Sequence, residues 1–156
     1  MKLLIKQRVF SWSETYDVYD EEQNSKYFVK GKVFSMNRQI FVYDTRTREE
    51  LGSVQQKLFT MMPQFDVYKG DIRYGTIKKK FTMIHPKYEM DYKGWYVEGD
   101  TFGWNYEVYK GDTLIFRITK KILEWGDTYE LDIQNEEDEF FALMLVIAID
   151  AANARN

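Results

Sequence analysis

The sequence predicts a mainly β protein, a closed antiparallel barrel of about twelve strands around a central hydrophobic C-terminal helix. Three observations predict it: a short strand pattern that repeats along the chain, turn signals after most copies, and a final apolar run. The chain has 156 residues. Because a domain typically has roughly 150 residues, we expect a single domain over 1–156. Within it we expect strands in about 2–134 and the central helix at about 136–152.

The repeated pattern is an aromatic residue, an acid, an aliphatic residue and often Tyr. Six copies, one of them looser, begin at Tyr16, Ile40, Phe65, Tyr88, Tyr106 and Tyr129. Successive side chains of a strand point to opposite faces. The first and third residues of each copy are therefore expected in the core, and the residue between them in water.

Turn signals and returning strands extend each copy into a hairpin. Gly and Asp follow Lys at 69–71 and 110–112, Gly follows Lys at 93–94, and the polar stretch 20–25 follows the first copy. Returning strands are expected at 51–59, 74–81 and 115–122. The sixth unit is short, so residues 2–12 are needed to complete the set of strands.

The C-terminal segment indicates a buried helix. Asn135 is a candidate N-cap followed by the acids of the 136–139 run, and ten consecutive apolar residues occupy 140–149. A helix that is apolar all round must be covered on every side, and a barrel of about twelve strands can admit a helix of ~10–12 Å diameter. Closure also removes exposed strand edges.

Targeting signals are not expected. The apolar run of ten residues falls short of the ~20 that span a bilayer, and the N-terminal apolar stretch of three residues is shorter than the ~7–15 of a signal peptide. The sequence predicts no transmembrane span and a cytoplasmic protein, with peripheral membrane association left open.

Composition excludes most catalytic classes. The net charge of −3 gives no overall attraction to nucleic acid. With no Cys and one His, a cysteine nucleophile, a disulfide framework, a zinc centre and a self-contained Ser-His-Asp triad are excluded or nearly so. Neither a GxGxxG nor a Walker pattern is present. We expect no catalytic residues, no metal and no cofactor.

Several segments resemble a known family: IKQRVFSW at 5–12, YDVYD at 16–20, QKLF at 56–59, IKKKF at 77–81, GWYVEGD at 94–100 and the ending 138–150. Together they resemble the bacterial LURP-one-related (YxjI-type) family of the tubby-like superfamily, over essentially the whole chain. The resemblance implies a twelve-stranded barrel around a C-terminal helix. Tubby domains bind phosphoinositides and related scramblase-like proteins associate with membranes, but bacterial members largely lack an assigned activity, and no lipid-binding residue carries over by motif.

The candidate binding residues are lysines at equivalent positions of the repeats. They are Lys57, Lys78, Lys79, Lys80, Lys120 and Lys121. They predict a cationic patch for phospholipid headgroups or another anion. The alternative is that outward lysines pair with the outward acids Asp17, Asp66 and Glu107 and only solvate the sheet.

A strict period of two places Lys79 and Lys120 on the same face as Ile77 and Ile118. These two lysines must then lie at a barrel rim or beside a bulge. A lysine at the rim would be well placed for binding.

Two rival functions remain open beside a non-enzymatic anion-binding barrel. One is a protein–protein interaction or scaffold module. The other is an enzyme or scramblase-like activity using carboxylates, for which Glu14 and Asp127 of the related motifs at 12–16 and 125–129 are candidates. His85, in a connector, is interpreted as a loop residue, and the acids at 136–139 as compensation of the helix dipole rather than a cation site.

Overall fold

The structure is a computed structural model that describes residues 1–6, 15–34, 37–80, 82, 87–123 and 126–153. In these residues, twelve strands precede one short 3-10 helix and one α-helix. The strands are β1 (Lys2–Ile5), β2 (Thr15–Tyr19), β3 (Ser25–Phe34), β4 (Asn37–Asp44), β5 (Glu50–Gln56), β6 (Gln64–Lys69), β7 (Ile72–Lys80), β8 (Lys87–Tyr92), β9 (Tyr96–Asp100), β10 (Asn105–Lys110), β11 (Thr113–Leu123) and β12 (Gly126–Ile133). The helices are η1 (Glu136–Asp138) and α1 (Glu139–Asn153).

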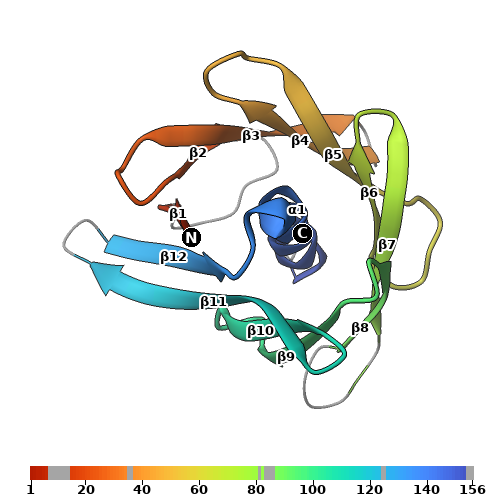
Figure 1. Cartoon of the computed structure of the whole chain (residues 1–156). Coiled ribbons are helices and arrows are strands. Elements are labelled where there is room, and N and C mark those ends of the chain that lie inside the picture. The colour runs from red at the N-terminus through yellow and green to blue at the C-terminus, as the bar shows by residue number, and fades with distance from the viewer. Residues whose placement is uncertain (7–14, 35–36, 81, 83–86, 124–125, 154–156) are drawn as a thin grey trace.

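All twelve strands form one antiparallel sheet that curls around α1 (Figure 1). The sheet follows chain order except at one place, where β1 lies between β2 and β12. Lys2 pairs with Asp132 and Ile5 pairs with both Tyr129 and Val18. The expectation that residues 2–12 complete the strand set is confirmed for Lys2–Ile5, whereas 7–12 lie outside the described residues. The twelve-stranded barrel around a helix is also confirmed.

The barrel has a seam between β8 and β9. These strands form the two ends of the sheet order, and within the described residues no backbone ladder joins them. The repeat predicted a hairpin here, as at the other units. Instead the turn buries Tyr92 and Trp95, whose rings meet edge to face with centroids 5.5 Å apart. Across the seam, the Tyr88 hydroxyl lies 3.1 Å from Thr101 Oγ1, so a side-chain hydrogen bond links its two sides.

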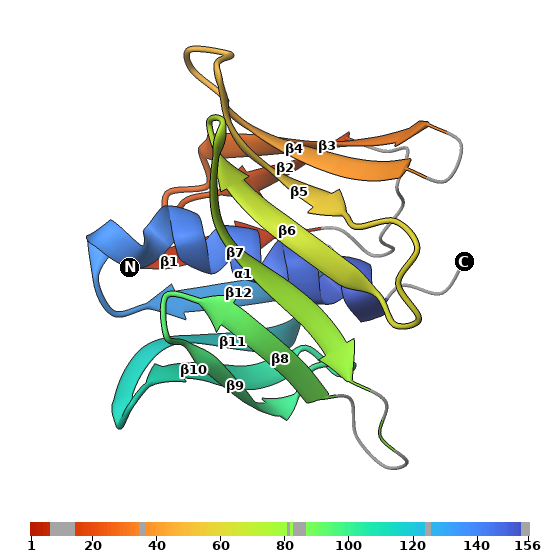
Figure 2. The ribbon, with the colours of Figure 1, turned by 90° about the vertical axis from the view of Figure 1, so that its right-hand side faces the viewer.

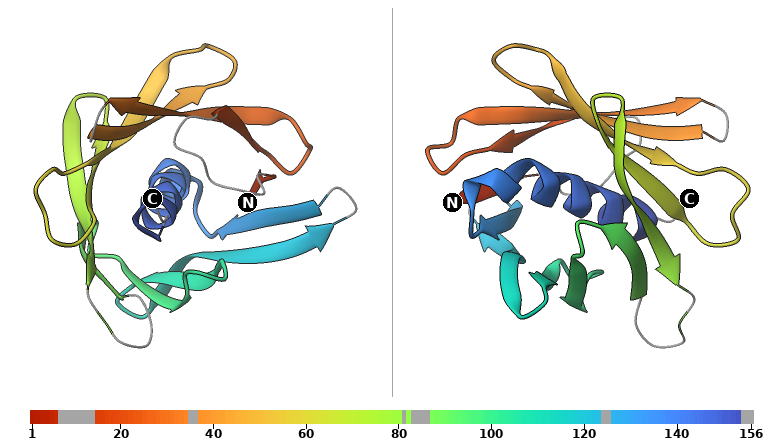
Figure 3. Two further views of the ribbon diagram at one scale, coloured as in Figure 1. Left: turned by 180° about the vertical axis from the view of Figure 1, so that it is seen from behind. Right: turned by 45° about the vertical axis from the view of Figure 1, so that its right-hand side comes forward.

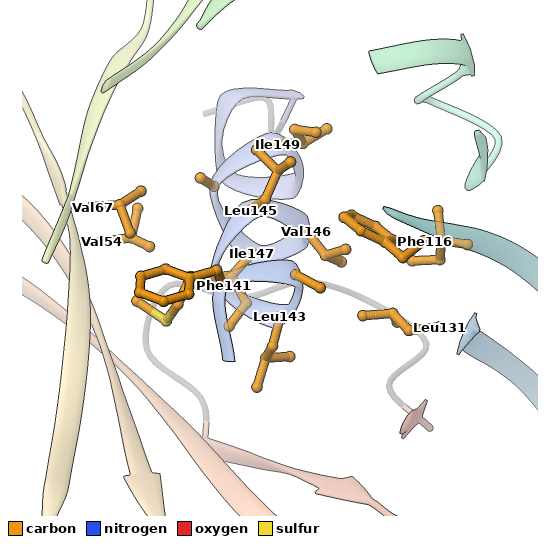
Figure 4. Close-up of a cluster of buried hydrophobic side chains, with 14 of the residues drawn as sticks. Val54, Val67, Phe116, Leu131, Phe141, Leu143, Leu145, Val146, Ile147 and Ile149 are labelled. Carbon is orange, nitrogen blue, oxygen red and sulfur yellow. The ribbon is translucent and has the colours of Figure 1, made fainter. Parts of the chain in front are cut away.

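Helix α1 occupies the centre of the barrel, and both views in Figure 3 show strands around it. Every residue from Phe141 to Ile149 is buried. Figure 4 shows residues from opposite walls, including Val54, Val67, Phe116 and Leu131, directed toward the helix. The expectation that an all-apolar helix needs cover on every side is confirmed.

The start of the helical segment differs in detail from the expectation. Asn135 occupies the N-cap position, but its side chain makes no capping hydrogen bond, and residues 136–138 form a 3-10 turn before α1. The backbone N–H of Asp138 donates to the Asn135 carbonyl at 3.0 Å instead. The buried acid of this run is Glu139, which accepts hydrogen bonds from Lys26 and Tyr27.

The inward positions of the repeat are buried as predicted. Val18, Val42, Val67, Val108 and Leu131 are each fully buried. In the copy on β8, Tyr88 and Met90 pack partly buried against the core while Glu89 is exposed. The aliphatic inward row of each copy therefore forms the barrel lining.

One strand is shorter than expected. The returning strand predicted at 51–59 ends at Gln56, and Leu58 and Phe59 lie in the loop that leads to β6. Phe59 has a positive φ of 60°. A strand cannot continue through this left-handed conformation. Pro63, at the end of this loop, has no N–H to extend the ladder.

Candidate anion-binding rim

The six predicted lysines lie at one end of the barrel, the end at which α1 finishes. Strand direction places them there, because β5, β7 and β11 all run toward this end. The lysines lie near the ends of β7 and β11 or, for Lys57, just after the end of β5. We call these six residues the rim lysines. Figure 2 shows this end on the right, where the β5–β6 loop projects in yellow.

Four of the rim lysines are brought together by pairing across β5, β6 and β7. The Lys57 N–H donates to the Gln64 carbonyl at 2.8 Å, and Gln64 pairs with Lys78 in the sheet register. The Lys79 N–H donates to the Pro63 carbonyl at 2.9 Å. Because adjacent strands are about 4.8 Å apart, these contacts place the four lysines at neighbouring backbone positions, a cluster in which Lys78 and Lys80 are on the outer face of β7 and Lys79 is on the inner face.

The other two rim lysines form a separate group. Lys120 and Lys121 lie on β11, opposite Tyr129 and Thr128 of β12. Between β7 and β11 lie β8, the seam, β9 and β10. The two groups are therefore separated by several strand spacings of ~4.8 Å each. The six lysines share an end of the barrel but do not meet as one patch.

Two of the lysines are paired with acids, as the solvated-face interpretation expects. Lys80 Nζ lies 3.9 Å from Glu89, and Lys121 Nζ lies 3.0 Å from Glu130. Burial opposes ionisation of Glu130, but hydrogen bonds from Lys121 and Lys2 lower its pKa. The acids that the sequence predicted as partners of the lysines have other partners: Arg73 lies 3.7 Å from Asp66, Arg117 lies 2.6 Å from Glu107, and Ser25 donates to Asp17.

Lys57 and Lys78 are different. Both are exposed, and within the described residues no ion pair or hydrogen bond of either ammonium group is found. Lys79 is partly buried, with its ammonium 5.1 Å from the centre of the Phe102 ring in the β9–β10 loop. The cluster on β5–β7 is therefore the part of the rim with cationic groups available to an anion.

Lys79 and Lys120 occupy the inner-face register at the rim. The pairings of β7 with β8 and of β11 with β12 contain no register shift, so neither lysine flanks a bulge in them. Ile77 and Ile118, two positions earlier, are fully buried. The strands thus continue past the packed core, which explains why an inward position can carry a charge.

The sequence prediction missed a set of apolar side chains at the same end. Phe59 and Met61 in the β5–β6 loop are 93% and 102% exposed, and Ile122 on β11 is 84% exposed. Leu58 and Phe102 are also exposed. The signal was present: the mostly apolar segment 58–63, which ends in Pro63 directly after the polar stretch 55–57, is atypical of a returning strand.

Behind the rim, the last turn of α1 carries polar groups into the barrel. The Tyr88 hydroxyl donates to Asn153 Oδ1. Asp150 raises the pKa of the partly buried Tyr16 and of the buried Tyr106, although desolvation is the larger cause in both. Burial raises the pKa of Asp150 itself to about 7. Within the described residues its carboxylate has no ion pair or hydrogen bond.

The positions of the two acids of α1, Glu139 and Asp150, do not support an enzyme that uses a pair of carboxylates. Glu139 and Asp150 stand at opposite ends of α1. At ~1.5 Å per residue they lie roughly 16 Å apart, beyond the ~9.5 Å of the widest hydrolytic carboxylate pairs. No group of three or more His, Cys, Asp or Glu in the described ranges could hold a metal ion. Glu14, His85 and the Asp127 side chain lie outside what the structure describes.

A model of the LURP-one-related family matches residues 1–150. The chain belongs to the LURP-one-related family. A curated relative, the uncharacterized protein YxjI of Bacillus subtilis, is 28% identical over 150 residues, covering 96% of this chain and 92% of the relative. An X-ray structure of an Arabidopsis thaliana protein superposes with a TM-score of 0.64 at 16% identity, over 96% of this chain and 90% of that one. The fold is tubby-like, as the resemblance implied.

No helix in the described part of the chain combines the length and the apolarity that a bilayer crossing requires.

Proposed function

We propose that this LURP-one-related protein is a non-enzymatic barrel that binds an anionic ligand, phospholipid headgroups at a membrane surface, through its rim lysines. The protein would act as a cytoplasmic, peripheral membrane component. The observation that carries the proposal is the cluster of Lys57, Lys78, Lys79 and Lys80, which backbone pairing holds at one end of the barrel. Lys57 and Lys78 have no anionic partner among the described residues.

Charge reversal at this cluster tests the proposal. Each basic residue near an anionic bilayer contributes about 1 kcal/mol, so Lys57→Glu with Lys78→Glu should weaken binding well over tenfold. Both side chains are exposed. The free energy of unfolding should therefore change by less than about 1 kcal/mol. The measurement is sedimentation with phosphatidylcholine vesicles, with and without phosphatidylserine, at about 0.15 M and about 1 M salt, where Debye lengths are ~8 and ~3 Å.

A matched control reverses two lysines at the opposite end of the barrel. Lys69→Glu with Lys110→Glu makes the same change in net charge at exposed positions beside the turns at Gly70 and Gly111. It should bind like wild type if location matters. Lys120→Glu with Lys121→Glu then reports whether the second group takes part.

Absence of wild-type binding to anionic vesicles at both salt concentrations would contradict the proposal. It would favour the scaffold interpretation, in which paired lysines such as Lys80 and Lys121 only solvate the surface. Equal binding by the Lys57/Lys78 variant and the Lys69/Lys110 control would also contradict it, because net charge rather than the rim would then control association.

A further inference from the structure

The β5–β6 loop, residues 57–63, exposes two large apolar side chains. Phe59 is 93% exposed and Met61 102% exposed, and Leu58 beside them is 39% exposed. Single exposed apolar residues are common on protein surfaces, but adjacent ones on a projecting loop mark interaction sites. Figure 2 shows this loop projecting from the end of the barrel where α1 finishes.

The backbone holds Phe59 in an unfavourable conformation. Its positive φ lies in the left-handed region. A bulky residue rarely adopts that region, whereas glycine would adopt it without steric strain. The position nevertheless carries Phe, whose exposed ring contributes little core packing. Strained residues persist where function requires them, so Phe59 is better explained by an external contact than by the fold.

The loop is fixed among cationic residues. Lys57 begins it, and backbone hydrogen bonds from Lys57 to Gln64 and from Lys79 to Pro63 close both ends. Lys78 stands opposite Gln64 in the sheet register. Exposed apolar side chains thus project from a base of lysines at the same end of the barrel.

We propose that the β5–β6 loop inserts Phe59 and Met61 into the headgroup–acyl boundary of an anionic bilayer, with Lys57 and Lys78 against the lipid phosphates. This inference rests on the proposed function and adds how the protein docks: end-on, with the end of the barrel that carries the rim lysines facing the membrane. Apolar side chains flanked by lysines suit that boundary, because a lysine stem lies along apolar surface while its ammonium stays hydrated.

The composition favours a bilayer over a protein partner. Protein interfaces are depleted in Lys and use Arg as their preferred cation. The cations that flank this loop are lysines. Two other exposed apolar residues at this end also lie near lysines. The Phe102 ring contacts the Lys79 ammonium, and Ile122 follows Lys120 and Lys121 on β11.

A site-specific label tests insertion directly. The chain has no Cys, so Met61→Cys can be labelled at a single position with an environment-sensitive fluorophore. The control is Ile72→Cys, at a residue that is 64% exposed and lies beside the Gly70 turn at the opposite end. With vesicles that contain phosphatidylserine, the Met61 label should shift to the blue and be quenched by brominated acyl chains, while the Ile72 label should not change.

Substitution variants supply the second measurement. Phe59→Ser with Met61→Ser should weaken partitioning onto phosphatidylserine vesicles about tenfold or more, because the apolar part of binding is removed while every lysine stays. Ile72→Ser should bind like wild type. Phe59→Gly is the folding control: it relieves the left-handed strain, so it should melt at the same or a higher temperature while binding weakens.

The outcomes separate this inference from the proposed function. If the rim charge reversals abolish binding but the Met61 label stays in water and the Ser variant binds like wild type, insertion is wrong and headgroup binding stands. If wild type fails to bind phosphatidylserine vesicles, both are wrong. If the label is shielded without lipid and gel filtration shows self-association that Phe59→Ser removes, the loop is a protein contact and the inference is overturned.

Discussion

At the scale of single residues, Asp150 departs most from the expected pattern. It follows the apolar run of α1 and lies inside the barrel, where Tyr16 of β2, Tyr88 of β8 and Tyr106 of β10 face it. Burial raises its pKa from 3.8 to about 7. Its place in the last turn of α1 adds to the disadvantage of a negative charge, because helix C-termini favour cations.

The pH dependence of Asp150 follows from the sign of that shift. The unfolded chain loses this proton more readily than the folded one, so stability is lost as the pH rises from about 4 through 7. Each pKa unit corresponds to about 1.4 kcal/mol. Asp150→Asn should therefore match wild type near pH 4 and exceed its stability by about 2–4 kcal/mol at pH 8.

Urea unfolding at a series of pH values measures this difference. Asp91→Asn, at an exposed position on β8, controls for the general loss of a negative charge. A stability difference between Asp150→Asn and wild type that stays constant between pH 4 and pH 8 would show that the carboxyl is not held in a desolvated site.

At the scale of elements, α1 is tied to the wall of the barrel near both ends. Lys26 Nζ lies 2.7 Å from Glu139 Oε1, the Tyr27 hydroxyl donates to the same carboxylate at 2.7 Å, and the Tyr92 hydroxyl donates to the Phe141 carbonyl at 2.7 Å. At the far end Tyr88 donates to Asn153. These polar contacts fix the rotation and depth of a helix whose apolar surface is uniform.

Removal of one partner of Glu139 should destabilise the fold. Glu139 is 6% exposed, so Lys26→Met leaves a buried carboxylate without its cation. The Lys26 side chain is 40% exposed, so water compensates in part. We expect a loss of about 1–3 kcal/mol, measured by denaturant unfolding. In the Lys26→Met background, Glu139→Gln should restore stability, since a neutral amide needs no counterion.

Lys2→Met is the matched control for the Lys26 substitution. It breaks a surface pair with Glu130, which retains Lys121 at 3.0 Å. Its cost should therefore stay below about 1 kcal/mol. Equal losses from Lys2→Met and Lys26→Met would show that the Glu139 contact does not anchor α1.

The sequence predicted elements well where the signal is local. Alternation within each repeat identified the inward residues, such as Val67 and Val108, because two neighbouring residues settle which face is buried. The end of β5 was missed, because Leu58 and Phe59 have strand-forming composition while a left-handed φ and Pro63 end the ladder. The seam and the division of the rim lysines were not predictable, because they depend on barrel circumference.

At the scale of the whole molecule, the barrel and its helix form one cooperative unit. β1 at the N-terminus pairs with β12 near the other end of the chain, and α1 follows β12, so the ring of strands cannot close before most of the chain is in place. The strands present their inward rows to α1 rather than to each other (Figure 4). Loss of the helix should therefore unfold the whole barrel and not a part of it.

Leu145→Asp tests that cooperativity. Leu145 is fully buried at the middle of α1. An unpaired charge in such a site costs several kcal/mol against a total stability on the order of 10 kcal/mol. We expect loss of near-UV circular dichroism and of the cooperative thermal transition.

The control is Ile122→Asp, the same kind of change at a position that is 84% exposed. This variant should melt within a few degrees of wild type, because exposed substitutions change stability little. A Leu145→Asp protein with unchanged melting would mean that α1 is not the core of this barrel.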